Sequence, residues 1–242
     1  MDKYGIIGYP LGHSFSRGFF TEKFAKENID AEYVNFEVPD AAALRDILRE
    51  NPELRGLNVT LPHKQAVIPL LDEISDEASE IGAVNVIRVR NGKTKGFNSD
   101  IIGFMESIKP LLKPHHTQAL ILGTGGASRA IRVGLSRLGI KWKYVSRTPR
   151  EGMLTYNDLS PVVMQKYTVI VNCSPIGMFP KVDGTPDIPY DQLTDKHLLY
   201  DLVYNPGETQ FMLRGAAMGA TVKNGLEMLH LQAVASWRFW NE

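Results

Sequence analysis

The sequence predicts an α/β protein of two domains, and three observations lead to this prediction. Short apolar runs alternate with helical patterns along both halves of the 242-residue chain, which is typical of sheets whose strands are connected by helices. A new strand pattern starts at Gln118, well after a tight-turn dipeptide at Asn91-Gly92 and a helix expected from about Ser99. The apolar content of 43% and the charged content of 22% are those of an ordinary globular protein.

The first domain begins with alternating strands and helices. Apolar runs that predict strands lie at residues 4–8, 31–38, 56–61 and 83–89. Helical patterns separate these runs at residues 16–28, from about Ala41 and after Pro62, and a short strand at 93–98 leads toward the next helix. This alternation predicts a mixed α/β layer structure.

The second domain starts with a continuous apolar run from Gln118 to Gly123, as expected for a strand buried on both faces of a parallel sheet. Strand patterns follow at 141–147, 168–174 and 197–204, again separated by helical stretches. Residues 225–240 have apolar side chains at helical spacing and predict one amphipathic helix. The junctions of this domain are expected near residues 100 and 224.

The charge balance and the apolar runs exclude several classes of protein. The 27 basic and 27 acidic residues cancel, and no segment concentrates lysine and arginine as a nucleic-acid groove requires. The amino end lacks the pattern of a secretory signal, and every apolar run is far shorter than the roughly 20 residues that cross a bilayer. We therefore expect a cytoplasmic protein with neither nucleic acid nor membrane as a partner.

Cysteine and histidine predict no metal site. Cys173 is the single cysteine, and its place at a strand end without an evident basic partner predicts a packing role. His115 and His116 are adjacent and therefore point in different directions, with no further ligand pair at metal-binding spacing.

A glycine-rich turn follows the first strand of the second domain. Gly123, Gly125 and Gly126 come directly after the buried strand and open a helix, for which Ser128 could supply the cap. Glycines there let the backbone approach a pyrophosphate, whose charge the amides and dipole at a helix N-terminus attract. Such turns also occur for packing reasons, so the motif alone leaves both interpretations open.

The end of the second strand indicates which dinucleotide is bound. NAD enzymes usually place Asp or Glu there to bind the adenosine ribose. This chain instead has a hydroxyl-rich basic segment, composed of Ser146, Arg147, Thr148, Pro149 and Arg150. Guanidinium groups bind a 2′-phosphate through charge-assisted hydrogen bonds, which favours NADP; the alternative is that both arginines are solvated loop charges.

Polar residues interrupt the expected packing at the outlet of the first strand. His13, Ser14 and Ser16 lie where a helix begins, so their hydroxyls and the helix amides suit a carboxylate. Alternatively, Ser14 or Ser16 simply caps the helix.

A second and a third polar cluster contain candidate catalytic residues. Asn58 and Thr60 lie near the end of a strand, and Lys64 follows in the first turn of the expected helix, where its charge would oppose the helix dipole. Asn85 lies on a later strand, and Asp100 starts the helix after 93–98, a place that the dipole favours in any case. If Lys64 and Asp100 share a pocket, each tunes the protonation of the other.

Segments along nearly the whole chain match, in order, those of a known family: GYPLGHSFS, NVTLPHK, GAVNV, GFNSD, GTGGASRA, SRT, NCSPIGM, DLVYNP and GLEMLHLQA. The chain thus resembles the shikimate dehydrogenase family. The resemblance implies reversible NADP-dependent reduction of 3-dehydroshikimate to shikimate, at ring carbon 3, in aromatic amino acid and chorismate biosynthesis. It also implies a substrate domain of residues 1–100 plus 225–242 and a Rossmann-like, doubly wound NADP domain of residues 101–224, with the active site in the cleft between them.

The same resemblance implies the roles of individual residues. Lys64 and Asp100 would be the catalytic pair, and which of them is the formal proton donor stays open because interacting groups titrate together. The substrate would be held by Ser14, Ser16, Asn58, Thr60, Asn85, Tyr204 and Gln232, with Asp100 also in contact. The cofactor would be bound by Gly123, Gly125, Gly126, Ala127, Ser146, Arg147, Thr148, Arg150, Met178 and Gly225, with Met178, Tyr204 and Gly225 near the nicotinamide.

Departures from the family pattern leave alternatives open. Arg17 replaces a usual proline, Ser99 replaces a threonine and keeps its hydroxyl, and Ser146 replaces an asparagine. A quinate/shikimate dehydrogenase with relaxed substrate or NAD use is one alternative, and a non-catalytic NADP-binding sensor is another. The presence of both Lys64 and Asp100 argues against the sensor. The sequence is compatible with a monomer or a homodimer.

Overall fold

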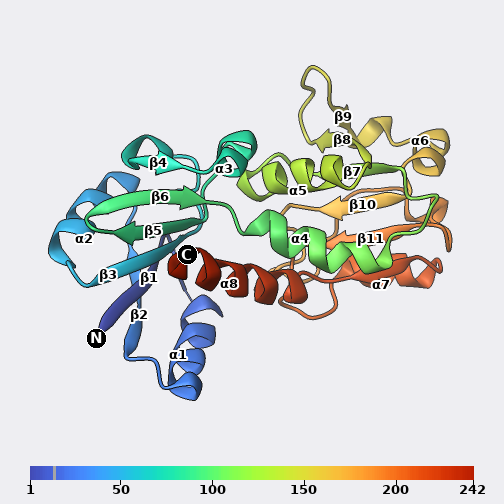
Figure 1. The fold of residues 1–242 in the computed structure, drawn as a ribbon. Helices are drawn as coiled ribbons and strands as arrows, with labels where there is room; N and C mark the ends of the chain where they lie inside the picture. Colours follow the sequence, from blue (N-terminus) through green and yellow to red (C-terminus); the bar gives the residue numbers. More distant parts are fainter. Residues whose placement is uncertain (13–14) are drawn as a thin grey trace. The chain divides into compact units, whose positions relative to one another are not determined.

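The computed structural model of the chain describes residues 1–12 and 15–242 (Figure 1). The chain divides into two compact units: unit 1 contains Met1–Ser99 and Gln232–Glu242, and unit 2 contains Asp100–Leu231. Each unit has its own six-stranded sheet, so the α/β class is confirmed. Junctions were expected near residues 100 and 224. The chain divides after Ser99, at the first expected junction, and after Leu231, which lies inside the last helix and beyond the second expected junction.

Unit 1 contains a mixed sheet with the strand order β2-β1-β3-β5-β6-β4. Strand β1 is parallel to its two neighbours β2 and β3, whereas β5 is antiparallel to both β3 and β6. The two-residue strand β4, which the hydrophobic pattern does not indicate, is parallel to β6. The strands are β1 (Asp2–Gly8), β2 (Ala31–Glu37), β3 (Leu54–Val59), β4 (Glu73–Ile74), β5 (Val86–Arg90) and β6 (Lys93–Phe97).

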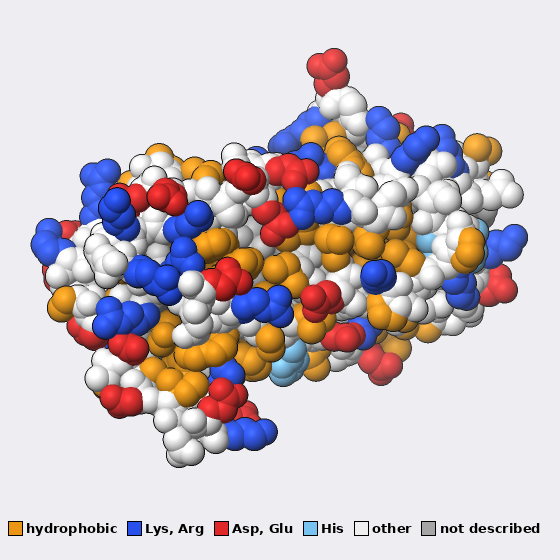
Figure 2. Space-filling view, in the orientation of Figure 1, with side chains coloured by type: hydrophobic (Ala, Val, Ile, Leu, Met, Phe, Trp, Pro, Cys, Tyr) orange, Lys and Arg blue, Asp and Glu red, His pale blue; other side chains and the backbone are white. Residues whose placement is uncertain are grey.

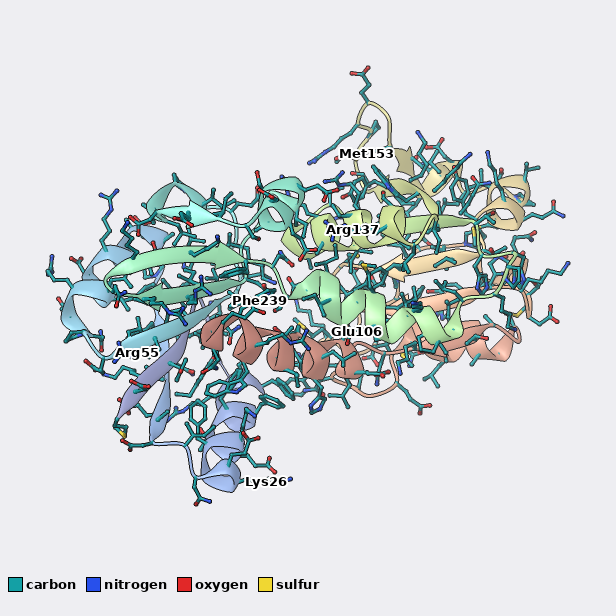
Figure 3. All side chains as sticks on the ribbon, viewed as in Figure 1. Lys26, Arg55, Glu106, Arg137, Met153 and Phe239 are labelled. Atoms are coloured by element: carbon teal, nitrogen blue, oxygen red, sulfur yellow. The ribbon has the colours of Figure 1, made fainter. Side chains whose placement is uncertain are left out.

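Two apolar cores cover the two faces of this sheet. On one face Tyr4 and Phe20 pack with Trp240 of the last helix, and Phe239 stacks on Phe97 with ring centroids 4.5 Å apart (Figure 3). On the other face Ile7 packs with residues of α2 and α3. The helices of unit 1 are α1 (Phe15–Glu27), α2 (Leu44–Glu50), α3 (Asp76–Ile81) and the end of α8 (Leu226–Asn241), with short 3₁₀ turns η1 (Ala41–Ala43) and η2 (Ile68–Leu70).

The prediction of a helix after Pro62 is wrong. Residues 61–67 form turns, and only the short η2 follows. The carbonyl of Lys64 accepts a 2.7 Å hydrogen bond from Val84 N, and Ile68 N donates to Gln65 O instead. The backbone group that would continue a helix is therefore bonded to a distant part of unit 1.

Unit 2 contains an all-parallel sheet with the strand order β12-β11-β10-β7-β8-β9. This is the order of a doubly wound dinucleotide-binding fold, in which the strand order reverses at the central pair β7 and β10. The strands are β7 (Gln118–Leu122), β8 (Lys141–Ser146), β9 (Leu154–Thr155), β10 (Val169–Asn172), β11 (Leu198–Asp201) and β12 (Thr221–Lys223).

Helices cover both faces of the parallel sheet, which explains why its central strands are continuously apolar. Phe104 and Ile131 pack on one face together with Met228 at the start of α8, and Met164 and Phe211 pack on the other. The helices are α4 (Asp100–Ile108), α5 (Gly126–Arg137), α6 (Pro161–Lys166) and α7 (Gln210–Ala217), with 3₁₀ turns η3 (Lys109–Leu111), η4 (Tyr156–Asp158) and η5 (Tyr190–Gln192).

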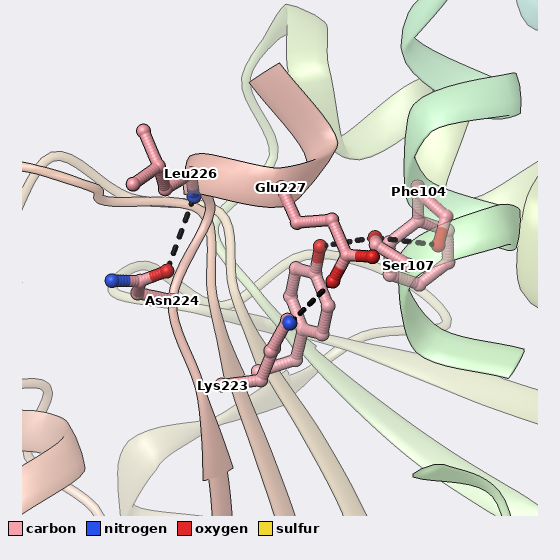
Figure 4. Close-up of polar contacts among 7 residues, drawn as sticks. Phe104, Ser107, Lys223, Asn224, Leu226 and Glu227 are labelled. Carbon is pink, nitrogen blue, oxygen red and sulfur yellow. Dashed lines mark hydrogen bonds and ion pairs between the residues drawn. The ribbon is translucent and has the colours of Figure 1, made fainter. Parts of the chain in front are cut away.

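The last helix begins at a well-defined turn. Leu226 N donates a 3.2 Å hydrogen bond to Asn224 Oδ1, and Lys223 pairs with Glu227 one turn later (Figure 4). The expected amphipathic helix over 225–240 is thus observed as α8.

Charges of both signs are interspersed over the face shown in Figure 2, in keeping with the zero formal net charge. Within residues 1–12 and 15–242, none of the helices combines the length and the apolar character required to span a membrane.

Candidate active site

The turn after β7 has the backbone geometry that a glycine-rich phosphate loop requires. Gly123 has a φ of +99°, a conformation that other residues rarely adopt. Gly125 precedes α5 as its N-cap, and a Cβ added at Gly125 or Gly126 would meet no atom within 4 Å. Ser128 does not cap the helix; it is the third residue of α5 and donates to Gly125 O over 2.7 Å. The glycines at the start of α5 therefore border open space, and the positive end of the helix dipole favours an anion there.

A cavity of about 650 Å³ lies at this turn, at the carboxyl ends of β7, β8 and β10. We call it the glycine-turn cavity. It occupies the switch point of the doubly wound sheet, where such folds bind ligands. It is lined by Gly123, Thr124, Gly125, Val145, Ser146, Arg147, Thr148, Arg150, Tyr156, Cys173, Ser174, Pro175 and Ile176.

The segment after β8 gives one side of the glycine-turn cavity a positive charge. Ser146 is buried, and its hydroxyl accepts a 3.3 Å hydrogen bond from Thr148 N. Arg147 and Arg150 are exposed and both line the cavity. Among the described residues that line it there is no aspartate or glutamate, so this side can bind a phosphate and lacks the carboxylate that would bind an unmodified ribose.

Six of the ten predicted cofactor residues meet at the glycine-turn cavity: Gly123, Gly125, Ser146, Arg147, Thr148 and Arg150. Gly126, Ala127, Met178 and Gly225 are not among its lining residues. Gly126 and Ala127 are the first two residues of α5. Gly225 has a packing reason of its own, because a Cβ there would lie 2.2 Å from Leu202 O.

Sequence reasoning missed several residues that line the glycine-turn cavity. Tyr156 comes from η4, after the two-residue strand β9. Thr155 and Asp158 form a capping box that marks the start of η4, but this pattern does not indicate a cavity residue. Burial raises the pKa of Tyr156, and the nearby Arg147 opposes this effect. Ser174 and Ile176 follow β10, and only their place after a strand end could have indicated them.

A buried hydrogen-bond network in unit 1 brings together predicted substrate residues. Asn58 Nδ2 donates to Ser236 Oγ over 2.9 Å. Asn85 Nδ2 donates to Ser99 Oγ over 3.0 Å, and Ser99 N donates to Asn85 Oδ1 over 2.6 Å. Ser99 Oγ in turn lies 3.3 Å from Gln232 Oε1 and 3.2 Å from Ser236 Oγ. We call this set, completed by Tyr33, the amide network.

Tyr33 anchors one end of the amide network and was missed at the sequence level. Its hydroxyl donates a 2.8 Å hydrogen bond to Asn58 Oδ1. Burial raises the pKa of Tyr33 well above its ordinary value, and a hydrogen bond with Ser16 offsets this only in part. The phenol therefore stays protonated at neutral pH and remains a donor. Amides and hydroxyls fixed in this way suit the hydroxyl groups of a small polar ligand.

The two predicted catalytic residues belong to different units. Lys64 is partly buried in unit 1, and its carbonyl bonds to Val84 N beside Asn85. Because Lys64 lies in a turn, the helix-dipole argument for its unusual position does not apply. Asp100 is buried at the start of α4 in unit 2, directly after Ser99 of the amide network.

The other predicted substrate residues are placed as follows. Ser14, like His13, lies outside the described residues. Ser16 is buried in the first turn of α1, as its second residue rather than its cap. Thr60 directly follows β3, and Thr60 N donates to Ile7 O over 2.9 Å. Tyr204 is partly exposed and belongs to unit 2.

Comparisons with known proteins agree with these features. Residues 6–87 match the family model of the shikimate dehydrogenase substrate binding domain. The chain is 36% identical to shikimate dehydrogenase (NADP(+)) of Desulforamulus reducens, over 98% of this chain and 88% of that protein.

Solved structures give the same result. Shikimate dehydrogenase of Aquifex aeolicus superposes with a TM-score of 0.88 at 34% identity, covering 100% of this chain and 92% of that one. Shikimate 5-dehydrogenase of Thermus thermophilus, solved with NADP(H) and shikimate, superposes with a TM-score of 0.87 at 30% identity over 99% of this chain and 93% of that one. Sequence and fold thus agree along the whole length, and the chain belongs to the shikimate dehydrogenase family.

Proposed function

We propose that this chain is an NADP-dependent shikimate dehydrogenase, which interconverts 3-dehydroshikimate and shikimate. The observation that carries the proposal is the family relationship over 98% of the chain. The glycine-turn cavity supports the cofactor half of the reaction, and the amide network supports the substrate half.

The residues around the glycine-turn cavity fit NADP. The open space at Gly125 and Gly126 leaves room for a pyrophosphate against the first amides of α5. Arg147, Thr148 and Arg150 would bind the 2′-phosphate, and Met178, Tyr204 and Gly225 would lie near the nicotinamide. When bound, NADP supplies or accepts the hydride at ring carbon 3 of the substrate.

The amide network fits a small hydroxylated acid. Asn58, Asn85 and Gln232 would bind ring hydroxyls together with Thr60, while the hydroxyls of Ser14 and Ser16 would bind the carboxylate. A site that hydrogen-bonds several hydroxyls discriminates strongly against analogues that lack one of them, because its buried polar groups are then left unpaired.

Lys64 and Asp100 would manage the single proton of the reaction. In the reducing direction the Lys64 ammonium would donate a hydrogen bond to the ketone oxygen and supply its proton as the alkoxide forms. Asp100 would orient the reacting group by accepting a hydrogen bond from a neighbouring hydroxyl. The ketone thus gains one hydride at carbon and one proton at oxygen, and in the reverse direction both are returned.

One assay tests this proposal. Purified protein is mixed with NADP and shikimate, and the absorbance of NADPH is followed. The same measurement is repeated with quinate and with NAD. We expect fast turnover with shikimate and NADP and slower turnover in the other combinations. Turnover with quinate equal to that with shikimate would favour the relaxed dehydrogenase, and no turnover with any combination would favour the NADP-binding sensor.

A further inference from the structure

Two buried polar side chains lie next to each other at the ends of neighbouring strands in unit 2. Asn172 ends β10, Asp201 ends β11, and the two residues are paired in the sheet register. Both are fully buried, and neither lines the glycine-turn cavity. The proposed reaction uses neither of them, and an ionised carboxyl is costly to bury unless its hydrogen bonds are satisfied.

Asp201 accepts hydrogen bonds on both carboxylate oxygens. Oδ1 accepts from Asn172 Nδ2 over 3.0 Å and from Val203 N over 3.0 Å. Oδ2 accepts from the hydroxyl of Thr209 over 2.6 Å. Burial raises the pKa of Asp201 to about 6 although these donors oppose the effect, so the group is mostly ionised above neutral pH.

Asn172 connects Asp201 to the wall of the glycine-turn cavity through hydrogen bonds. Its Oδ1 accepts from Ser174 N over 3.0 Å and from Ser174 Oγ over 2.6 Å. Ser174 Oγ accepts in turn from Ile176 N over 3.4 Å, and Asn172 Nδ2 lies 3.5 Å from Ile176 O. Ser174 and Ile176 both line the cavity.

The chemistry of the pair fixes which way the amide points. An ionised carboxylate can only accept hydrogen bonds, so Asn172 must turn its NH₂ group toward Asp201. Its oxygen then faces Ser174, whose backbone N–H can only donate and whose hydroxyl donates here as well. The opposite orientation would place two donors against each other at Ser174 and two acceptors against each other at Asp201.

We propose that Asp201 is a positioning residue for cofactor binding: by orienting Asn172, it holds the wall formed by Ser174 and Ile176 in the shape that NADP requires. The inference rests on the proposed function in taking NADP as the ligand of the glycine-turn cavity. Thr209 forms a separate arm. Its hydroxyl donates to Asp201 and accepts from Met212 N, which caps α7, and within residues 1–12 and 15–242 it makes no hydrogen bond to Ser174 or Ile176.

The first experiment compares three variants of the full chain. NADPH affinity is titrated by the fluorescence of the nicotinamide, without substrate, well below each variant's unfolding temperature. Asp201→Ala removes every acceptor, and we expect its Kd for NADPH to rise about tenfold or more, as for one lost hydrogen bond. Asp201→Asn keeps an acceptor for Asn172, and Thr209→Val removes only the separate arm, so both should stay within about twofold of the unchanged chain. A folded Asp201→Ala variant with the Kd of Thr209→Val would overturn the proposal.

A second pair of variants keeps the test informative if Asp201→Ala does not fold. Asn172→Asp preserves an acceptor for Ser174 but places two carboxylates against each other, so the Kd for NADPH should rise about tenfold. Adding Asp201→Asn restores a donor between the two positions, and the double variant should recover to within about threefold. An unchanged Kd in the single variant, or no recovery in the double, would contradict the positioning role.

These measurements are independent of the enzyme assay. If the chain binds NADPH but does not oxidise shikimate, the proposed reaction is wrong and the proposed role of Asp201 is unaffected. A chain that oxidises shikimate, with Asp201→Ala affecting only the unfolding temperature, would leave the reaction intact and make Asp201 purely structural.

Discussion

The phenol of Tyr33 donates a 2.8 Å hydrogen bond to the side-chain oxygen of Asn58, inside unit 1. This bond leaves the NH₂ group of Asn58 directed at Ser236. Tyr33 thus fixes the orientation of an amide that is proposed to bind substrate, although Tyr33 itself is a residue that packing alone would explain.

Tyr33→Phe should therefore weaken substrate binding. The ring still packs against Phe20, but Asn58 loses the donor that fixes its oxygen. We expect the KM for shikimate to rise about 5- to 30-fold, as for a hydrogen bond of roughly 1 to 2 kcal/mol, with the KM for NADP unchanged. Steady-state kinetics with each substrate varied in turn measures this, and Tyr4→Phe on the same face is the matched control. Equal increases in both KM values would show a general loss of structure instead.

Lys64→Ala should mainly affect turnover. Loss of a general acid lowers kcat by about 10² to 10⁴, with a smaller effect on KM. Lys95→Ala, which removes a partly exposed lysine paired with Glu73, serves as the control and should keep the original kcat. An unchanged kcat in Lys64→Ala would remove this residue from the mechanism.

Arg147→Ala should affect one cofactor and spare the other. A charge-assisted hydrogen bond to the 2′-phosphate is worth about 1.5 to 3 kcal/mol, so kcat/KM with NADPH should fall about 10- to 150-fold and kcat/KM with NADH should change little. Arg137→Ala, in the last turn of α5 (Figure 3), is the control for removing an arginine from unit 2. If NADPH and NADH lost the same factor, the phosphate assignment would be wrong.

The stability of the protein relative to its Asp201→Asn variant should depend on pH. Burial raises the pKa of Asp201 to about 6 in the folded chain, above the ordinary value of 3.8. The folded state therefore binds a proton that the unfolded state does not bind between these values, and this contribution is lost as the pH rises through about 6. At pH 5 the free energy of unfolding of the unchanged chain, relative to Asp201→Asn, should be about 1.4 kcal/mol higher than at pH 8.

Urea denaturation of both proteins at the two pH values measures this difference. Other titrating groups are common to both proteins and cancel in the comparison. A difference that does not change with pH would show that the carboxyl of Asp201 has an ordinary pKa.

The sequence predicted the two α/β layers well because their central strands are long apolar runs. The strand expected from Gln118 is observed as β7, and the last helix is observed as α8. The strands β4, β9 and β12 have only two or three residues and no periodicity, so they depend on pairing with neighbouring strands. The prediction of a helix after Pro62 failed because of a contact between distant segments, the hydrogen bond from Val84 N to the carbonyl of Lys64.

The sequence indicated some residues of the candidate site and not others. Motif residues such as Gly123, Arg147 and Asn85 were predicted as site residues because their residue types interrupt the expected packing or occupy a position typical of nucleotide binding. Tyr33 and Ser236 were not found, because an aromatic residue on a strand and a serine on a helix have ordinary local roles. Only the folding of distant segments brings them against Asn58.

The amide network has a consequence for the entropy of binding. Asn58 and Asn85 are held by hydrogen bonds to neighbouring protein groups, so their rotamers are set by the protein itself. Freezing a flexible side chain at an interface costs about 0.5 to 1.5 kcal/mol. Side chains already restricted in this way have little freedom left to lose, and most of what they contribute to a ligand is retained as affinity.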